Sequence, residues 1–276
     1  MNFHTRSHPS GSGTSRGLLA ALLLALSVSA LPASVSAQYF GRNKVQYETF
    51  DFKILKTPHY DIHFYPEEGE AVEDAARMAE RWYERFARIF QHEFERPKPI
   101  ILYADHPDFQ QTNTLSGNLS EGLGGVTESL KNRVIMPLTG SYADTDHVLG
   151  HELVHAFQYN LAEAWAGAGM RGLSLLPLWV IEGIAEYFSV GQEDALTAMW
   201  LRDGIRRGAL PTLEQLSSGE IFPYRFGHAF WAFMGGMFGD DRVADIFRRA
   251  LRIGWEPALA QVVGMGSDSL SARWRE

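Results

Sequence analysis

The sequence predicts an α+β protein in which a sheet-bearing lobe, residues 38–140, precedes a helical lobe, residues 141–276. Three observations support this prediction. Apolar and polar residues alternate at the two-residue period of a strand in the first half of the chain. In the second half, apolar residues recur at helical spacing between glycine and proline breaks. We find no internal repeat, which excludes a solenoid or a propeller within the chain, and we expect a cleft between the lobes.

The sheet-bearing lobe contains one long helix and four predicted strands. Residues 60–64 alternate between apolar and polar side chains, as in a half-buried strand. In the segment 72–90, apolar residues recur every three or four positions on one helical face. A short apolar strand is predicted at residues 99–102. Residues 124–128 and 133–136 are predicted to form a hairpin around a polar turn.

The first 37 residues have the features of an export signal. Arg6 and Arg16 precede an apolar run at residues 18–26, and small residues occupy the cleavage positions 35–37. A membrane anchor is the alternative, but the apolar run is shorter than the ~20 residues that a spanning helix needs. We therefore expect the leader to be removed and the protein to be exported, periplasmic or extracellular, with no membrane span after cleavage.

Composition limits the partners and the chemistry. The chain has 33 acidic and 25 basic residues, a formal net charge of -8, so it lacks the basic excess that neutralises a phosphate backbone, and we expect no nucleic acid partner. An apolar content of 45% is sufficient for a sizeable core. The chain has no cysteine, so any metal ion must be held by histidines and carboxylates.

The most informative motif in the helical lobe is H-E-x-x-H, formed by His151, Glu152 and His155 after the capping residues that begin at Asp144. Four residues of helix advance about 6 Å and turn slightly more than once, so the two imidazoles project from one face and can meet one ion. Glu152 lies beside that face, where it can act on a water molecule without being a ligand. His147 lies about 12 Å along the axis from His155, too far to share an ion with it. We predict that His147 is a rim or capping residue.

A catalytic zinc takes three protein ligands and leaves one position open, so a third ligand is needed from another segment. The best candidates are Glu182 and Glu186, which stand four residues apart on a second predicted helix. The alternative is a solvated pair of glutamates on an amphipathic helix. The flanking Trp179, Ile181 and Ile184 favour a buried position for these acids.

The H-E-L-V-H motif, followed by the W-x-x-E-G-x-A-E-Y segment with 26 residues between His155 and Glu182, resembles the gluzincin metallopeptidases. The similarity is closest to the peptidase-MA-like domain that precedes TolB-like β-propellers in some exported bacterial proteins. The resemblance implies a thermolysin-like zincin, with a small mixed-sheet N-terminal lobe and a zinc site in the cleft. It also implies that Glu182 is the third zinc ligand, beside His151 and His155, and that Glu186 orients His151.

Two further segments are similar to gluzincin aminopeptidases. The segment P-Y-x-x-G-x-A at residues 223–229 places Tyr224 where the family has a donor to the oxyanion, with His228 as a weaker candidate. The alternative is that Tyr224 is an aromatic residue packed at a helix start. The strand at residues 124–128 corresponds to the edge strand that pairs with substrate backbone, which implies substrate-binding roles for Gly125 and Glu128. Glu128 would hold the amino terminus of the substrate.

Taken together, the motifs and the resemblance predict zinc-dependent hydrolysis of a peptide or protein substrate. Glu152 would take a proton from water as it attacks the peptide carbonyl and return it to the leaving amine. One alternative is a catalytically weak or inactive peptide-binding zincin domain, attached to or working with a β-propeller. Another is zinc-dependent hydrolysis of a bond other than a peptide, which needs the same ligands.

Overall fold

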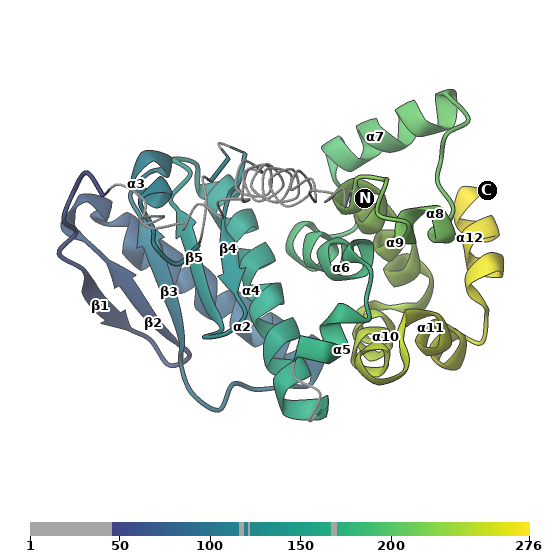
Figure 1. The fold of residues 1–276 in the computed structure, drawn as a ribbon, viewed down its shortest axis with the longest axis horizontal. Helices are drawn as coiled ribbons and strands as arrows, with labels where there is room; N and C mark the ends of the chain where they lie inside the picture. The colour runs from purple at the N-terminus through teal and green to yellow at the C-terminus, as the bar shows by residue number, and fades with distance from the viewer. Residues whose placement is uncertain (1–45, 116–118, 121, 167–169) are drawn as a thin grey trace, which may run out of the picture. The chain divides into compact units, whose positions relative to one another are not determined.

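The computed structural model describes residues 46–115, 119–120, 122–166 and 170–276 (Figure 1). The predicted leader, residues 1–37, lies outside the described residues. All the elements below belong to one unit that spans Asn43–Glu276. The fold is a small five-stranded mixed sheet followed by helices, so the predicted α+β class is confirmed.

The sheet has the strand order β1-β2-β3-β5-β4. The three central strands are parallel, and the outer strands β1 and β4 each run antiparallel to their neighbours. Strand β4 is therefore an edge of the sheet. The bounds of the strands, in the order of the sheet, are Lys53–Lys56, Tyr60–Phe64, Lys98–Tyr103, Arg133–Pro137 and Val126–Glu128.

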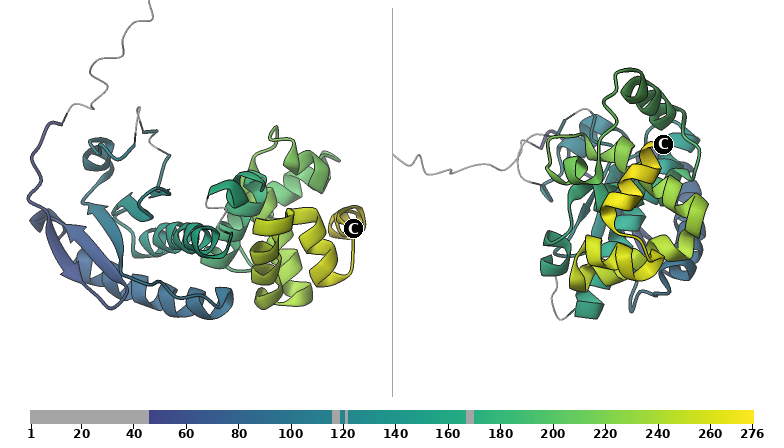
Figure 2. Two further views of the ribbon diagram at one scale, coloured as in Figure 1. Left: turned by 60° about the horizontal axis from the view of Figure 1, so that its bottom comes forward. Right: turned by 90° about the vertical axis from the view of Figure 1, so that its right-hand side faces the viewer.

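The two faces of the sheet are covered by different elements. Helices α2 (Ala71–Phe90) and α4 (Tyr142–Ala166) contact one face, and the short helix α3 (His106–Gln110) contacts the other (Figures 1 and 2). In β3 the side chains alternate accordingly. Ile100 belongs to the large core with α2 and α4, whereas Ile101 packs against the smaller aromatic cluster beside α3.

Helix α4 is held in the core by one side and presents the other side to the pocket. Leu149, Leu153, Phe157 and Leu161 are fully buried in the large core. The helix begins at Tyr142, two residues before the predicted start at Asp144. The cause is Ser141, whose carbonyl accepts a hydrogen bond from the Thr145 backbone NH at 2.9 Å and whose hydroxyl accepts one from Asp144 at 3.4 Å.

Only helices follow α4 in the described part of the chain. They lie on the β4 side of the sheet, beyond α4 (Figure 1). Among these helices, α7 contacts mainly α9. A single 3-10 turn, Pro66–Glu68, precedes α2. The helices after α4 are α5 (Met170–Ser174), α6 (Leu178–Val190), α7 (Ala195–Arg206), α8 (Leu213–Ser217), α9 (Pro223–Phe238), α10 (Asp240–Ile253), α11 (Trp255–Val263) and α12 (Ser267–Arg275).

Helices α6 and α9 pack backbone against backbone through two glycines. A Cβ atom on Gly183 would lie 2.6 Å from the carbonyl carbon of Gly227, and a Cβ atom on Gly227 would lie 2.7 Å from the Trp179 carbonyl oxygen. No side chain fits at either position without separating the helices. This close approach brings Glu182, which precedes Gly183, toward the start of α9.

The predicted hairpin is present but shorter than expected. Strand β4 starts at Val126, so Gly124 and Gly125 precede it instead of belonging to it. The turn contains Asn132, which has a positive φ of 46°, and its side chain donates to the Ala156 carbonyl at 3.2 Å. No helix among the described residues is both long and apolar enough to cross a membrane.

Candidate metal centre

Helices α4 and α6 bring two histidines and one glutamate to a common point. His151 and His155 lie one turn apart on α4, and their Nε2 atoms are 3.1 Å from each other. From α6, the Glu182 Oε2 atom lies 3.3 Å from His151 Nε2 and 3.1 Å from His155 Nε2. Three potential ligand atoms from two helices therefore face one another, and they form a group that could hold a metal ion.

A buried glutamine fixes the orientation of His155. Gln158 is completely buried, and its Nε2 donates to the Ile181 carbonyl at 3.0 Å. Its Oε1 therefore points the other way, 2.8 Å from His155 Nδ1. Because an amide oxygen only accepts, Nδ1 of His155 carries a proton, and when the ring is neutral the lone pair of Nε2 faces the metal group. Gln158 was not among the predicted site residues, although it follows His155 by three residues on the same helix.

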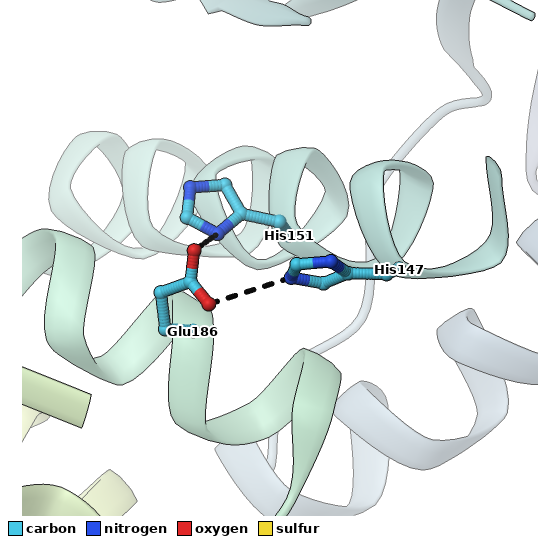
Figure 3. Close-up of side chains that lie close together, drawn as sticks. All are labelled: His147, His151 and Glu186. Carbon is cyan, nitrogen blue, oxygen red and sulfur yellow. Dashed lines mark ion pairs between the residues drawn. The ribbon is translucent and has the colours of Figure 1, made fainter. Parts of the chain in front are cut away.

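Glu186 links His151 to a second set of charged groups (Figure 3). Its Oε1 lies 3.6 Å from His151 Nδ1, and its Oε2 lies 3.4 Å from His147 Nε2. Arg225 on α9 places its Nη1 3.3 Å from the same Oε2 and 3.4 Å from Asp194 Oδ2. Burial raises the pKa of Glu186, but His147, His151 and Arg225 outweigh it and hold the pKa below its usual range.

His147, His151 and Glu186 form a second group with ligand atoms close enough to hold an ion. This group competes with the first, because it would use the other ring nitrogen of His151. Its closest pairs, at 3.4 and 3.6 Å, are longer than the 3.1 to 3.3 Å separations in the first group. Arg225 also already neutralises Glu186. The group with Glu182 is therefore the better metal site.

The electrostatics of the first group would favour a bound cation. Burial lowers the pKa of His155, but the charge of Glu182 and its hydrogen bond, with the charge of Glu152, raise it to about 9. Burial raises the pKa of Glu182, whereas His155 and His151 lower it well below its usual range. In the metal-free protein, a proton on His155 is thus paired with the Glu182 carboxylate, and a metal ion would replace that proton.

Glu152 lies beside the metal group but outside it. The Thr127 hydroxyl on β4 is 2.7 Å from Glu152 Oε2 and 2.8 Å from its carbonyl oxygen. A Cβ atom on Gly125 would lie 3.0 Å from Glu152 Cγ and 3.1 Å from Met136 Cβ. Thr127 therefore holds this carboxylate at the edge of the sheet, and a side chain at position 125 would crowd Glu152 and Met136. Thr127 was not among the predicted site residues.

These residues line a pocket of about 430 Å³ between β4 and the helices. Tyr224, near the start of α9, lines it with its ring stacked on His151, at 6.1 Å between ring centroids and 22° between planes. Burial and the charges of Glu182 and Glu152 raise the pKa of Tyr224, so its hydroxyl keeps its proton near neutral pH. The remaining lining residues are Gly122, Leu123, Gly124, Gly125, Val126, Thr127, His147, Val148, His155, Tyr159, Glu186, Phe222 and Arg225.

Two predicted residues lie elsewhere. Glu128 is on β4, but it is opposite Arg133 in the hairpin, and the Arg133 Nε is 2.9 Å from its carboxylate. This ion pair draws the side chain to the hairpin, so Glu128 is not among the residues that line the pocket. His228 is buried, with its ring nitrogens 2.8 Å from Thr197 Oγ1 and 2.7 Å from the Gly191 carbonyl oxygen. Both of its ring nitrogens are therefore used in packing α7 and α6 against α9.

Comparisons with known proteins give no match, either to a family model or to a curated protein sequence. Of the predicted site residues, His151, Glu152, His155, Glu182, Glu186, Gly125 and Tyr224 all line this pocket.

Proposed function

We propose that the chain is a zinc-dependent metallopeptidase of the gluzincin type with a zincin fold. The observation that carries this proposal is the convergence of His151 Nε2, His155 Nε2 and Glu182 Oε2 within 3.3 Å of one another beside Glu152. Placing three polar atoms together inside the protein does not improve packing and is unfavourable by itself. The arrangement is explained if the three atoms bind one metal ion.

The ligand set fits zinc. Two imidazole nitrogens and one carboxylate oxygen are the protein ligands of many catalytic zinc sites. With ligand bonds of 2.0–2.1 Å, neighbouring ligand atoms in a tetrahedron lie about 3.3 Å apart, close to the separations of 3.1 to 3.3 Å here. Bound zinc supplies Lewis acidity toward water and toward the substrate carbonyl. The remaining steps depend on the side chains around it.

Glu152 is the proton carrier. Its carboxylate accepts a proton from the attacking water as the new C–O bond forms, and it then returns that proton to the nitrogen of the leaving amine as the C–N bond breaks. The Thr127 hydroxyl, 2.7 Å from Oε2, holds the carboxylate in place. Because Glu152 is not one of the three converging ligands and Thr127 occupies only Oε2, the Oε1 atom can take part in this transfer.

Tyr224 stabilises the charge that develops on the carbonyl oxygen. Its raised pKa keeps the phenol protonated, so it can donate a hydrogen bond to that oxygen. Stacking on His151 fixes the ring beside the metal group, and a donor that is already in place costs no reorganisation during the reaction. The interaction grows stronger as negative charge increases, so it favours the transition state over the substrate.

The edge of the sheet provides a surface for the peptide backbone. Strand β4 pairs with β5 on one side only, and residues 122–127 line the pocket. An extended peptide added to this edge would run along the metal group, and the absence of a side chain at Gly125 lets this edge lie close against Glu152. The leader predicted at residues 1–37 implies that the substrate is met outside the cytoplasm.

The proposal is tested by metal content and by digestion of a mixed peptide library. Glu152→Gln should keep zinc and lose nearly all turnover, whereas Glu182→Ala should lose both. Glu163→Gln, which alters an exposed carboxylate on the same helix, is the matched control and should behave as the wild type. Equal turnover in the wild type and Glu152→Gln would remove the hydrolase proposal. Peptide binding without new termini would support the inactive peptide-binding alternative.

A further inference from the structure

A row of three aromatic rings leads from His151 in the metal group to the surface. Tyr224 is stacked on His151, Phe222 lies 5.2 Å from Tyr224 with 32° between planes, and Trp200 lies 5.2 Å from Phe222 with 29° between planes. We call Trp200, Phe222 and Tyr224 the aromatic row. Its inner end lines the pocket through Tyr224 and Phe222, and its outer end is on α7.

The two outer rings of the row are partly exposed to solvent. Phe222 is 47% exposed and Trp200 is 38% exposed. Helix α7 packs on α9 with the side that carries Thr197 and Gly204, both buried. Leu196, one turn before Trp200, and Met199, the residue next to Trp200, are exposed as well and lie away from the side that packs on α9. The aromatic row therefore continues into an apolar patch on α7.

The patch on α7 adjoins the pocket, and ion pairs connect the start of α7 to residues that line the pocket. Phe222 is at once a lining residue of the pocket and the stacking partner of Trp200. Asp194, which caps the start of α7, is tied to Arg225 at 3.4 Å, and Arg225 also contacts Glu186. Contiguous exposed apolar surface beside a pocket is typical of a ligand-binding surface. A ligand that reaches the metal group can therefore touch the row as well.

We infer that the aromatic row and the α7 patch form a subsite for an aromatic or large aliphatic side chain of the peptide substrate. This inference rests on the proposed function. Phe222 is two ring spacings, 6.1 and 5.2 Å, from His151, a span that an extended peptide crosses in roughly three residues. The selected side chain thus lies within about three residues of the cleaved bond. Stacked rings and burial of apolar surface both favour a phenylalanine or tryptophan there over an alanine.

The first experiment measures specificity. A mixed peptide library digested by the wild type should show phenylalanine, tryptophan, leucine or methionine enriched at one position within about three residues of the cut. A pair of peptides with phenylalanine or alanine at that position should differ at least about tenfold in kcat/KM. Trp200→Ser should reduce the ratio to below about threefold with unchanged zinc content, and Phe222→Leu should reduce it in part.

The control is on the same helix. Ile205 is 63% exposed on α7, and its side chain projects about 180° around the helix axis from that of Leu196. Ile205→Ser should keep the wild-type ratio. The inference is overturned if Trp200→Ser keeps the wild-type ratio, or if Ile205→Ser lowers it as much.

A second experiment separates this inference from the proposed function. The same two peptides are titrated into the Glu152→Gln protein by calorimetry, which reports binding whether or not the wild type cuts them. Tighter binding of the phenylalanine peptide, lost when Trp200→Ser is added, supports the subsite even if hydrolysis fails. Equal binding of both peptides overturns it. A dimer that Trp200→Ser dissociates, without any effect on peptide preference, would assign the patch to self-association and would also overturn it.

Discussion

Gln158 should control how tightly the site binds zinc, although it is not a ligand. Replacing it by leucine removes the acceptor 2.8 Å from His155 Nδ1 and the donor 3.0 Å from the Ile181 carbonyl. Because Ile181 precedes Glu182, the change releases one ligand directly and loosens the turn that carries another. Loss of a partner behind a ligand histidine typically lowers metal affinity about 10- to 100-fold. We expect that reduction for Gln158→Leu.

The same substitution leaves the buried Nδ1–H of His155 without a partner. At about 1–3 kcal/mol for such a group, the free energy of unfolding of the metal-free protein should fall by about 1–3 kcal/mol. Zinc affinity is measured by competition with a chelator at fixed pH, and stability by urea unfolding. Gln158→Glu, which keeps an acceptor for Nδ1, should recover part of the affinity. Gln261→Leu, an exposed glutamine on α11, is the control. A zinc affinity of Gln158→Leu within about threefold of the wild type would refute this account of the site.

Three further results are expected. The pKa of His155 is raised from 6.5 to about 9 in the metal-free protein, so the stabilisation from its charge is fully present below about pH 6.5 and is lost as the pH rises through about 9. Because zinc must displace that proton, zinc affinity should rise about tenfold per pH unit up to about pH 9. A zinc affinity that does not change between pH 6 and 9 would contradict this. Tyr224→Phe should lower kcat about 10²- to 10³-fold with zinc content unchanged, and an unaltered kcat would remove its role as donor. Thr127→Val, which removes the hydroxyl 2.7 Å from Glu152 Oε2, should lower kcat more than it changes KM, whereas a change in KM alone would show that Thr127 contacts substrate instead.

Local periodicity predicted the elements well. The alternation at residues 60–64 and the helical spacing at residues 72–90 both correspond to elements in the structure, because each pattern reflects burial on one face. The boundaries were less accurate. Helix α4 starts early because Ser141 satisfies its first backbone donors, and β4 starts at Val126, after the two glycines that the alternation had included.

The candidate site was predictable where it depends on spacing along one helix. The separation of His151 and His155 by four residues sets their common face, whatever surrounds them. The supporting residues depend on contacts between segments, which the order of residues does not define. Thr127 reaches Glu152 across 25 positions, and Glu128 is withdrawn by its cross-strand partner Arg133.

The packing of α6 against α9 could not be predicted from the sequence either. Gly183 and Gly227 are unremarkable as single glycines in apolar helices, and only their mutual contact shows why neither can carry a side chain. This contact sets the distance between Glu182 on α6 and Tyr224 on α9. Helix spacing therefore predicted the shared face of His151 and His155, and the family resemblance implied Glu182, whereas tertiary packing places Tyr224, the proposed donor to the oxyanion, beside them.

The central claim is that one metal ion is bound between His151, His155 and Glu182. A crystal of the zinc-loaded protein, measured on both sides of the zinc absorption edge, tests it directly by anomalous difference density. We predict one peak, about 2.0–2.2 Å from the two Nε2 atoms and the Glu182 carboxylate. A peak on the Nδ1 side of His151, between His147 and Glu186, or no peak at all near Glu182, would contradict the account.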